Sequence, residues 1–492
     1  MAEDNWYSNG NNNWNATNAW NTQADGGGTA LTNPNDEAHV IIQGNDTITL
    51  TAAIHSTIRS LTIDSGSDLD GHASYVIETT DEGNASFGSE HYAVKINGTT
   101  DSNVNLTVGG TFDTRLDLDG TMGNLILKGS GEKEFRGTPT IGGNVTIQDS
   151  CDATCAGAVV INGNLTITSG SYDTGSDHAL TVNGITTVAG TLTLNDSTVS
   201  LGAAYTADYG LEATGGGSDI DMGGATVTTG AVNIPSGDLT MTSETWTISS
   251  TKTSTSAFLN IATTDTFSHG SGILKFTSSG GGNVRCNQNL NNIIIDAVSG
   301  TPTWTIITQG FSCAGYFTLT DGTFNTGSNY ALTVTGAIHI DGTLTGNASA
   351  ISGDSVHIDG TFTHNGALTV SGIAGTNYAF QNLGTWTPST SQVTTFTGDG
   401  DGTYHVKSND WDSVVINAAG EQYIFRPKTG TAITFVDDLT VTAGNLIQNN
   451  NGDSWTVGGD VLVSDDTLGV STATGSLTFG SLTIADGATF NA

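Results

Sequence analysis

Cationic residues are scarce in this sequence. Lysine and arginine together number 12 among 492 residues, whereas aspartate and glutamate number 48, so the formal net charge is −36. Charged residues make up only 12% of the chain, against about 25% in a typical globular protein, so the acidity comes mainly from missing cations. Proteins that bind nucleic acid neutralise its phosphates with clustered lysine and arginine, and anionic membrane surfaces attract the same residues. The composition therefore argues against both kinds of partner.

Long apolar runs, cysteines and helix-forming segments are also lacking. No stretch approaches the roughly 18 apolar residues of a membrane span, so no membrane insertion is expected. The acidic start Met1–Trp6 has no apolar stretch and predicts no signal peptide. The four cysteines, Cys151, Cys155, Cys286 and Cys313, are too few for a disulfide scaffold and are expected to be buried thiols. No window shows the helical period of apolar residues, so no helix is predicted.

Two long segments of the chain repeat each other. Residues 163–194 read GNLTITSGSYDTGSDHALTVNGITTVAGTLTL, and residues 315–346 read GYFTLTDGTFNTGSNYALTVTGAIHIDGTLTG. The two align without a gap at an offset of 152 (315 − 163). A degenerate third copy begins at Asp438. Such self-similarity is the signature of a repeat architecture.

A shorter repeat indicates the kind of architecture. His339–Thr345 recurs as His357–Thr363 at an offset of 18 (357 − 339), and Asn144–Ile147 recurs as Asn164–Ile167 at an offset of 20 (164 − 144). This spacing suits one coil of a β-solenoid, and a propeller blade needs about 40 residues. Within each coil apolar residues alternate with threonine, as strands require, and glycine, asparagine and aspartate separate the strands. The sequence predicts an all-β parallel β-helix, with right-handedness taken from the commoner class; a string of small β-sandwich domains is the alternative.

The repeats divide the chain into an N-terminal segment and a series of modules. Three of the eight tryptophans, Trp6, Trp14 and Trp20, lie in an asparagine-rich start. They predict a cap over the open end of the solenoid, with a docking segment as the alternative. The expected divisions are a cap or attachment segment (1–40), first coils (41–122), module 1 (123–290), module 2 (291–411), and module 3 with a C-terminal cap (412–492).

One pair of motifs has the composition of a metal site. His339 and Asp341 recur as His357 and Asp359 in the next expected coil. Residues two apart share a strand face, and stacked strands lie about 5 Å apart. If the coils stack in register, the imidazoles and carboxylates therefore form a candidate divalent-metal site. A surface His–Asp ladder that binds no ligand is the alternative.

No catalytic constellation is recognisable elsewhere. Carboxylates cluster at Asp64, Asp68 and Asp70 and again at Asp399 and Asp401, but such residues are typical of solvated turns. They resemble neither standard calcium loop, so calcium or another divalent cation is only an option. A lyase also needs a cation beside its carboxylates, and the sequence groups none of the few candidates with them: Arg115, Lys128, Lys133, Arg136, Arg285, Arg426 and Lys428. The sequence predicts no enzyme, catalytic residue or cofactor.

The repeats resemble those of phage fibre and appendage proteins and of bacterial surface adhesins. Residues 165–184, 317–336 and 34–50 carry the likeness, as a pattern of composition and turns that covers most of the chain after residue 34. The resemblance implies a virion fibre, spike or head decoration located on the particle, with other virion proteins as partners, host-surface glycan as a candidate ligand and a homotrimeric assembly. The alternatives are a bacterial or archaeal adhesin or filament protein, outside the cell or on its surface, and a tailspike-type polysaccharide depolymerase.

Overall fold

The computed structural model shows strands joined by turns. It describes residues 4–35, 38–53, 57–80, 92–119, 121–253, 255–262, 265–372, 378–390, 392–398, 403–448, 452–469 and 475–491. Within these ranges the regular elements are all β-strands, and none of these residues lies in a helix long and apolar enough to cross a membrane. The predicted all-β parallel β-helix is confirmed, with about 20 turns. The β-sandwich alternative is wrong, because successive coils are joined by parallel pairing.

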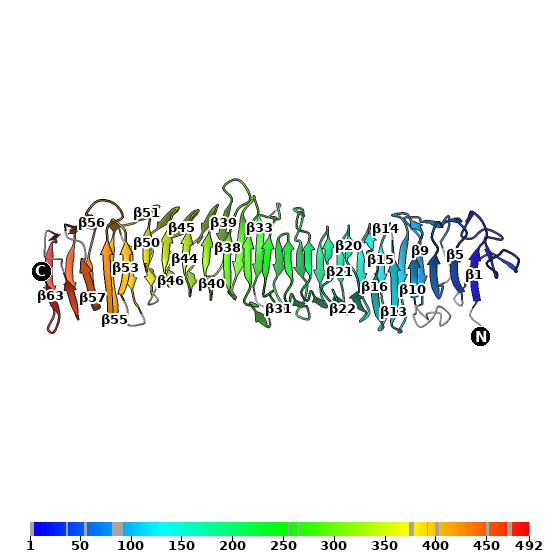
Figure 1. The fold of residues 1–492 in the computed structure, drawn as a ribbon, viewed down its shortest axis with the longest axis horizontal. Helices are drawn as coiled ribbons and strands as arrows, with labels where there is room; N and C mark the ends of the chain where they lie inside the picture. The colour runs from blue at the N-terminus through cyan, green and yellow to red at the C-terminus, as the bar shows by residue number, and fades with distance from the viewer. Residues whose placement is uncertain are drawn as a thin grey trace. The chain divides into compact units, whose positions relative to one another are not determined.

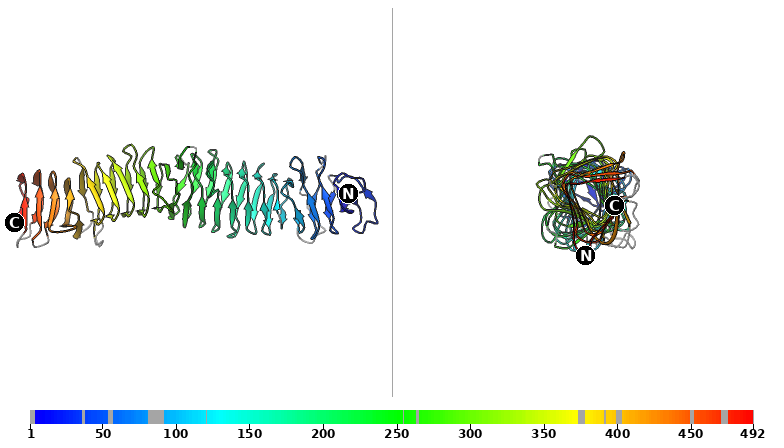
Figure 2. Two further views of the ribbon diagram at one scale, coloured as in Figure 1. Left: turned by 90° about the horizontal axis from the view of Figure 1, so that it is seen from above. Right: turned by 90° about the vertical axis from the view of Figure 1, so that its left-hand side faces the viewer.

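The chain divides into two compact units, each described by itself. Unit 1 comprises Met1–Thr255 and Thr263–Gly272, and unit 2 comprises Ser256–Ala262 and Ile273–Ala492. In each unit one coil contributes a strand to each of three columns, and most strands pair with the corresponding strand one coil away. The coils of unit 1 follow one another as blue to green rungs in Figure 1, and Figure 2 shows those of unit 2 in green through yellow to red.

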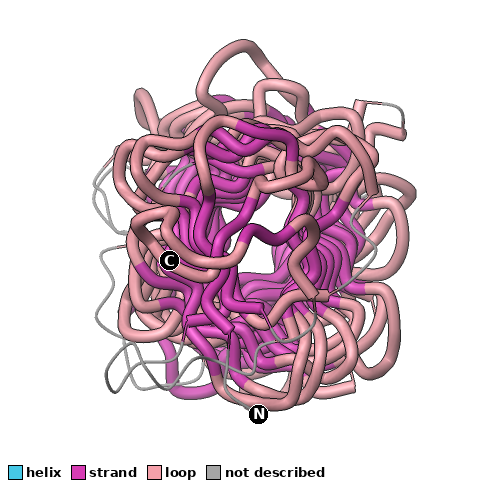
Figure 3. The backbone as a smooth tube through the Cα atoms, turned by 90° about the vertical axis from the view of Figure 1, so that its right-hand side faces the viewer, coloured by secondary structure: helices cyan, strands magenta, loops and turns pink. Residues whose placement is uncertain are grey.

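The three columns of unit 1 follow one another around each coil. Viewed onto the N-terminal end of this unit, strands form an inner ring and loops lie outside it (Figure 3). The first column consists of β1 (Asp4–Ser8), β5 (Ala38–Ile42), β7 (Ser60–Ile63), β10 (Tyr92–Ile96), β13 (Thr114–Leu118), β16 (Glu132–Arg136), β19 (Asp152–Cys155), β22 (Ser171–Asp173), β25 (Thr191–Thr193), β28 (Asp219–Asp221), β31 (Asp238–Thr240) and β34 (Phe267–Ser268). The second consists of β2 (Asn12–Asn13), β6 (Thr47–Thr49), β8 (Asp68–Asp70), β11 (Thr99–Thr100), β14 (Thr121–Met122), β17 (Thr140–Ile141), β20 (Val159–Ile161), β23 (Leu180–Val182), β26 (Thr198–Leu201), β29 (Thr226–Thr229) and β32 (Thr245–Ile248). The third consists of β9 (Val76–Thr79), β12 (Asn105–Val108), β15 (Leu125–Leu127), β18 (Val145–Ile147), β21 (Leu165–Ile167), β24 (Thr186–Val188), β27 (Leu211–Ala213) and β30 (Val232–Ile234).

Unit 2 has the same three-column plan. The column that contains His339 and His357, here called the histidine column, carries the candidate site. The histidine column consists of β35 (Ile273–Phe276), β38 (Asn292–Ile295), β41 (Phe317–Leu319), β44 (Ile338–Ile340), β47 (Val356–Ile358), β50 (Phe380–Asn382), β53 (Thr403–Lys407), β60 (Thr467–Gly469) and β63 (Thr489–Asn491). The next column consists of β33 (Ala257–Ile261), β36 (Gly282–Cys286), β39 (Thr303–Ile306), β42 (Thr323–Asn325), β45 (Thr343–Asn347), β48 (Thr361–His364), β51 (Thr385–Pro388), β54 (Asp410–Trp411), β56 (Ala432–Phe435), β58 (Ser454–Val457) and β61 (Ser476–Thr478). The last consists of β37 (Asn289–Leu290), β40 (Phe311–Cys313), β43 (Leu332–Val334), β46 (Ile351–Gly353), β49 (Leu368–Val370), β52 (Val393–Phe396), β59 (Asp460–Val463) and β62 (Ser481–Ile484), with the long strands β55 (Ser413–Arg426) and β57 (Leu439–Gln448) shared with the histidine column.

Alternation within each strand builds the core. In β21 the side chains of Leu165 and Ile167 are fully buried, whereas Thr166 between them is half-buried. Each such apolar side chain contributes about 1.5–3 kcal/mol to stability when it leaves water. Stacked coils repeat this arrangement, because parallel register places Val145 beside Leu165 and Ile147 beside Ile167. The outward positions are left for short polar side chains.

An asparagine ladder explains the recurrence of Asn144 as Asn164. The side-chain oxygen of Asn124 accepts the backbone N–H of Asn144 at 2.8 Å, and the oxygen of Asn144 accepts that of Asn164 at 2.8 Å. Asn105 accepts from Asn124 at 3.0 Å in the same way. Each asparagine thus satisfies a backbone donor at the turn of the next coil, which a turn outside the strand ladder would otherwise leave open.

The long repeat of the sequence is also a repeat of structure. Strands β21, β22, β23 and β24 match β41, β42, β43 and β44 at both ends, at the same offset as the sequence repeat (317 − 165 for the first pair). A buried corner recurs too. Thr174 donates to the Leu194 carbonyl and accepts from Ser197, both at 2.8 Å. At the equivalent positions, Thr326 donates to the carbonyl of Gly346 and accepts from Ser349, both at 2.7 Å.

The N-terminal segment forms the predicted cap. After β1 the first column ends in two antiparallel strands, β3 (Trp20–Asn21) and β4 (Ala30–Leu31). Trp14 and Trp20 are fully buried, their rings meet edge to face at 4.9 Å, and the Trp20 indole N–H donates to the Trp14 carbonyl at 2.8 Å. The indoles therefore form an apolar cluster at this end of unit 1, and the docking role stays a prediction.

Candidate metal centre

The β-strand register brings the two predicted histidines together. His339 lies on β44 and His357 on β47, and the two residues are direct partners in the parallel ladder. Both strands bury the residues on either side of the histidine, so the imidazoles project outward. Asp341 and Asp359 follow one residue after the ends of their strands, on the same outward side. A ladder of two histidines and two aspartates results, as the sequence spacing predicts.

The nitrogen and oxygen atoms of this ladder converge. The two rings are stacked, with centroids 4.7 Å apart and planes at 27°. The Nε2 atom of His339 lies 3.1 Å from Asp341 Oδ1 and 3.3 Å from Asp359 Oδ2, and His357 Nε2 lies 3.1 Å from the same Asp359 oxygen. Ligand atoms of His339, His357 and Asp359 all lie within 4.8 Å of one another. Asp359 is therefore the centre of the cluster.

The cluster is partly open to solvent. The side chains of His339 and His357 are 42% and 36% exposed, and those of Asp341 and Asp359 are 39% and 40% exposed. Water or a further ligand can therefore reach the atoms that face outward. An exposed ion pair contributes only about 0–1 kcal/mol to the free energy of unfolding. A gain in folding stability is therefore a weak explanation for this cluster.

The neighbouring coils delimit the cluster. Thr318 on β41 pairs with His339, and Gln381 on β50 pairs with His357. Gln381 therefore places an amide beside His357. The sequence did not reveal this neighbour, because the 24 residues from His357 to Gln381 (381 − 357) exceed the 18- to 20-residue spacing of the short repeat. In the equivalent coil of unit 1, Thr187 and Ala189 occupy the positions of His339 and Asp341. The fold therefore does not require the histidine and the aspartate.

Carboxylates gather at two other places in unit 1. Burial, followed by the neighbouring Asp68 carboxylate, raises the pKa of Asp70. Burial, followed by the carboxylates of Asp238 and Asp221, raises the pKa of Asp219. Sequence reasoning missed the second group, because Asp219 and Asp238 become neighbours only through the pairing of β28 with β31.

The other carboxylates singled out from the sequence are Asp64, Asp399 and Asp401. Asp64 lies at a turn, where its carbonyl accepts the backbone N–H of Ser67 at 2.9 Å. Asp399 and Asp401 lie outside the described residues.

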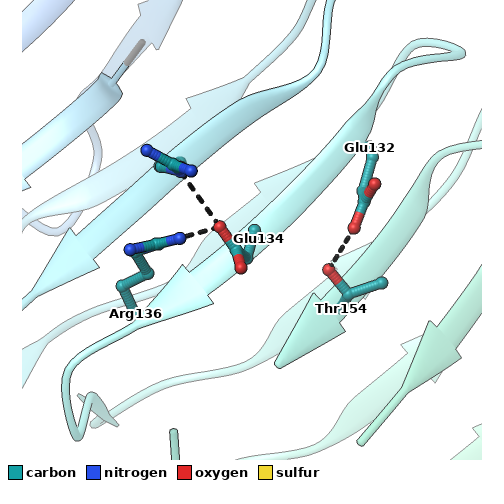
Figure 4. A network of polar contacts seen from close by, with 5 residues as sticks. Glu132, Glu134, Arg136 and Thr154 are labelled. Atoms are coloured by element: carbon teal, nitrogen blue, oxygen red, sulfur yellow. Dashed lines mark hydrogen bonds and ion pairs between the residues drawn. The ribbon is translucent and has the colours of Figure 1, made fainter. Parts of the chain in front are cut away.

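Several of the scarce cations form ion pairs on the outer face. Glu134 lies between two guanidinium groups, with Arg136 Nε at 2.8 Å and Arg115 Nε at 3.1 Å. Figure 4 shows the contact between Glu134 and Arg136. Lys128 lies 2.6 Å from Glu78 in the same manner. Arg115 and Glu134 are direct partners on the paired strands β13 and β16, and opposite charges on neighbouring strands commonly interact in this way.

The remaining cation candidates are dispersed. Lys133 is buried and donates to the carbonyl of Phe112 at 2.9 Å, and Lys428 donates to the carbonyl of Gly384. Burial, followed by the charge of Arg426, lowers the pKa of His405. Arg285 is exposed on β36.

The cysteines are buried free thiols, as predicted. Burial raises the pKa of Cys155, Cys286 and Cys313 to about 12 in each case. Because the thiolate is the reactive form and the usual metal ligand, these thiols are protonated and inert at neutral pH.

Comparison with known proteins adds no relative: no family model, curated protein or solved structure matches this chain.

Proposed function

We propose that the protein is a structural component of a virus-particle appendage, such as a fibre, spike or head decoration. The observation that carries this proposal is the regularity of the coils, in which the same three-strand plan recurs with an apolar inner face and short polar outer residues. Each coil is held by backbone pairing to its neighbours, so a long scaffold can be built without a cofactor. Such a scaffold suits a protein whose role is to support or present other parts of an assembly.

The outer surface supports a role in an exposed setting. A net charge of −36 with only 12 cationic residues keeps copies of the protein soluble and apart except where specific contacts form. Other virion proteins are the expected partners and host-surface glycan is the candidate ligand, in line with the resemblance of the repeats to appendage proteins. A homotrimer is proposed by the same analogy.

Mass spectrometry of purified virus particles tests this function. The protein should be present at a fixed copy number relative to the major capsid protein. A low copy number would indicate a tail fibre and a high one a head decoration. Absence from particles together with presence in a cell-surface fraction would refute the virion role and favour the adhesin alternative.

One observation favours a polysaccharide depolymerase as a second candidate function. Glycoside cleavage requires two carboxyl groups, one of them held protonated as the general acid. Asp219 lies in such a group of carboxyl groups, and burial, followed by the carboxylates of Asp238 and Asp221, raises its pKa. Incubation with host polysaccharide distinguishes the two functions, because a depolymerase releases reducing ends and a structural protein does not.

A further inference from the structure

The geometry points to a transition-metal site formed by His339, His357 and Asp359, with Asp341 beside it, at which a Zn²⁺-like cation joins two adjacent coils of unit 2. This inference is independent of the function proposed above. It concerns a binding property of the chain that holds for any appendage, adhesin or enzyme built on this solenoid.

The ligand spacing already fits a metal ion. Zinc binds imidazole nitrogen and carboxylate oxygen at about 2.0–2.1 Å in tetrahedral geometry, which places neighbouring ligand atoms about 3.3 Å apart. Asp359 Oδ2 lies 3.3 Å from His339 Nε2 and 3.1 Å from His357 Nε2. Two of the three ligand separations thus have the required length. Only the two nitrogens, which lie within 4.8 Å of each other, need a small tilt of the rings to close on the ion.

The donor set selects the class of cation. Two imidazoles suit Zn²⁺, Ni²⁺ and Cu²⁺, whereas Ca²⁺ and Mg²⁺ prefer sites composed of oxygen ligands. Asp341 and Asp359 supply the carboxylates beside the two imidazoles that a divalent cation would need. The outward exposure of the four side chains leaves room for water to complete the coordination.

The repeat of the chain shows that these ligands are not a by-product of the fold. The equivalent coil of unit 1 has Thr187 and Ala189 in place of His339 and Asp341. Within unit 2, the position before His339 in the register is Thr318 and the position after His357 is Gln381. The histidines are therefore confined to two adjacent coils, where an ion can bridge them.

Binding of the ion should hold strands β44 and β47 together, because it takes ligands from both. An ion that binds only the folded pair of coils lowers the equilibrium population of their locally open state by a factor of one plus the ratio of free ion to Kd, or about a hundredfold at 100 times Kd. Amide exchange in residues 338–358 should therefore slow on addition of Zn²⁺. Exchange in the equivalent coil of unit 1, residues 186–213 from β24 to β27, should not change.

The experiment is isothermal titration of Zn²⁺ into the untagged full chain, with Ca²⁺ titrated in parallel. We expect one saturable site for Zn²⁺ and none for Ca²⁺ at these residues. H339T, H357T and D359N should each weaken Zn²⁺ binding at least tenfold, because each removes a ligand. H339T introduces the threonine found at the equivalent position 187, so it should leave the coil folded, as circular dichroism would verify.

H178Y is the matched control, because the equivalent position in unit 2 is Tyr330. It removes a histidine from the same kind of repeat and should leave Zn²⁺ affinity unchanged. Failure of the wild-type chain to bind Zn²⁺ saturably would overturn the proposal. Equal affinity in the folded H339T, D359N and wild-type chains would overturn it as well, since the ion would then bind elsewhere.

Discussion

The buried hydrogen bond between Thr174 and Ser197 recurs between Thr326 and Ser349, so one prediction can be tested at two places in the molecule. Thr174 and Ser197 are almost fully buried, and the Thr174 hydroxyl makes two hydrogen bonds of 2.8 Å, donating to the carbonyl of Leu194 and accepting from Ser197. T174V keeps the shape of the side chain but removes the hydroxyl. The Ser197 hydroxyl then loses its acceptor, and the Leu194 carbonyl keeps only the backbone N–H of Ser197 at 3.2 Å. Leaving a buried polar group unsatisfied costs about 1–3 kcal/mol.

A double-mutant cycle isolates the contribution of the hydrogen bond. S197A should cost about 1 kcal/mol, because Thr174 can still donate to Leu194. The double variant T174V/S197A should cost less than the sum of the two single changes, since it removes both partners together, and the coupling should be about 0.5–1.5 kcal/mol. T326V and S349A should reproduce these values, because the equivalent hydrogen bonds are both 2.7 Å.

Hydrogen exchange followed by mass spectrometry is the suitable assay, because a solenoid opens locally and need not unfold in one step. A loss of about 2 kcal/mol in T174V corresponds to about thirtyfold faster exchange in residues 174–201. T166V is the control, since Thr166 is only half-buried and its replacement should change exchange by less than about 0.5 kcal/mol. Additive effects of T174V and S197A, or an effect at one corner and none at the other, would refute the reasoning.

Two further predictions concern buried titratable groups. Burial lowers the pKa of His364 from its ordinary value of 6.5. As the pH falls below about 6.5, the unfolded chain therefore gains a proton that the folded chain excludes. The urea midpoint of unfolding should decrease as a result. Asn347 is the partner of His364 in the strand ladder, so H364N introduces a residue that this ladder already contains. This variant should show a smaller decrease in the urea midpoint between pH 7.5 and 5.5. An equal decrease would assign the pH dependence to other groups. The four buried cysteines should not react with a thiol reagent at pH 8 in the native protein and should all react after denaturation, whereas rapid labelling of the native chain would contradict their burial.

The sequence alone determined the fold class and the repeat unit. The alternation in Leu165–Thr166–Ile167 requires one buried and one outer face, and the short repeat spacings correspond to the coil-to-coil register of His339 with His357 and of Val145 with Leu165. This information is local and periodic, because each coil contacts mainly its neighbours. The predicted His–Asp ladder followed from the same register.

Only the tertiary structure decided which groups meet across coils of unequal length. The proximity of Asp219 to Asp238 depends on a coil step of 19 in register (238 − 219), and Gln381 reaches the position beside His357 after a longer step of 24 (381 − 357). The sequence likewise could not show that Asp359 Oδ2 faces both histidines. The length of each turn determines which residues are paired in a solenoid, and the side-chain rotamers determine the distances between their atoms. Neither is fixed by the alternation of polar and apolar residues that specifies the strands.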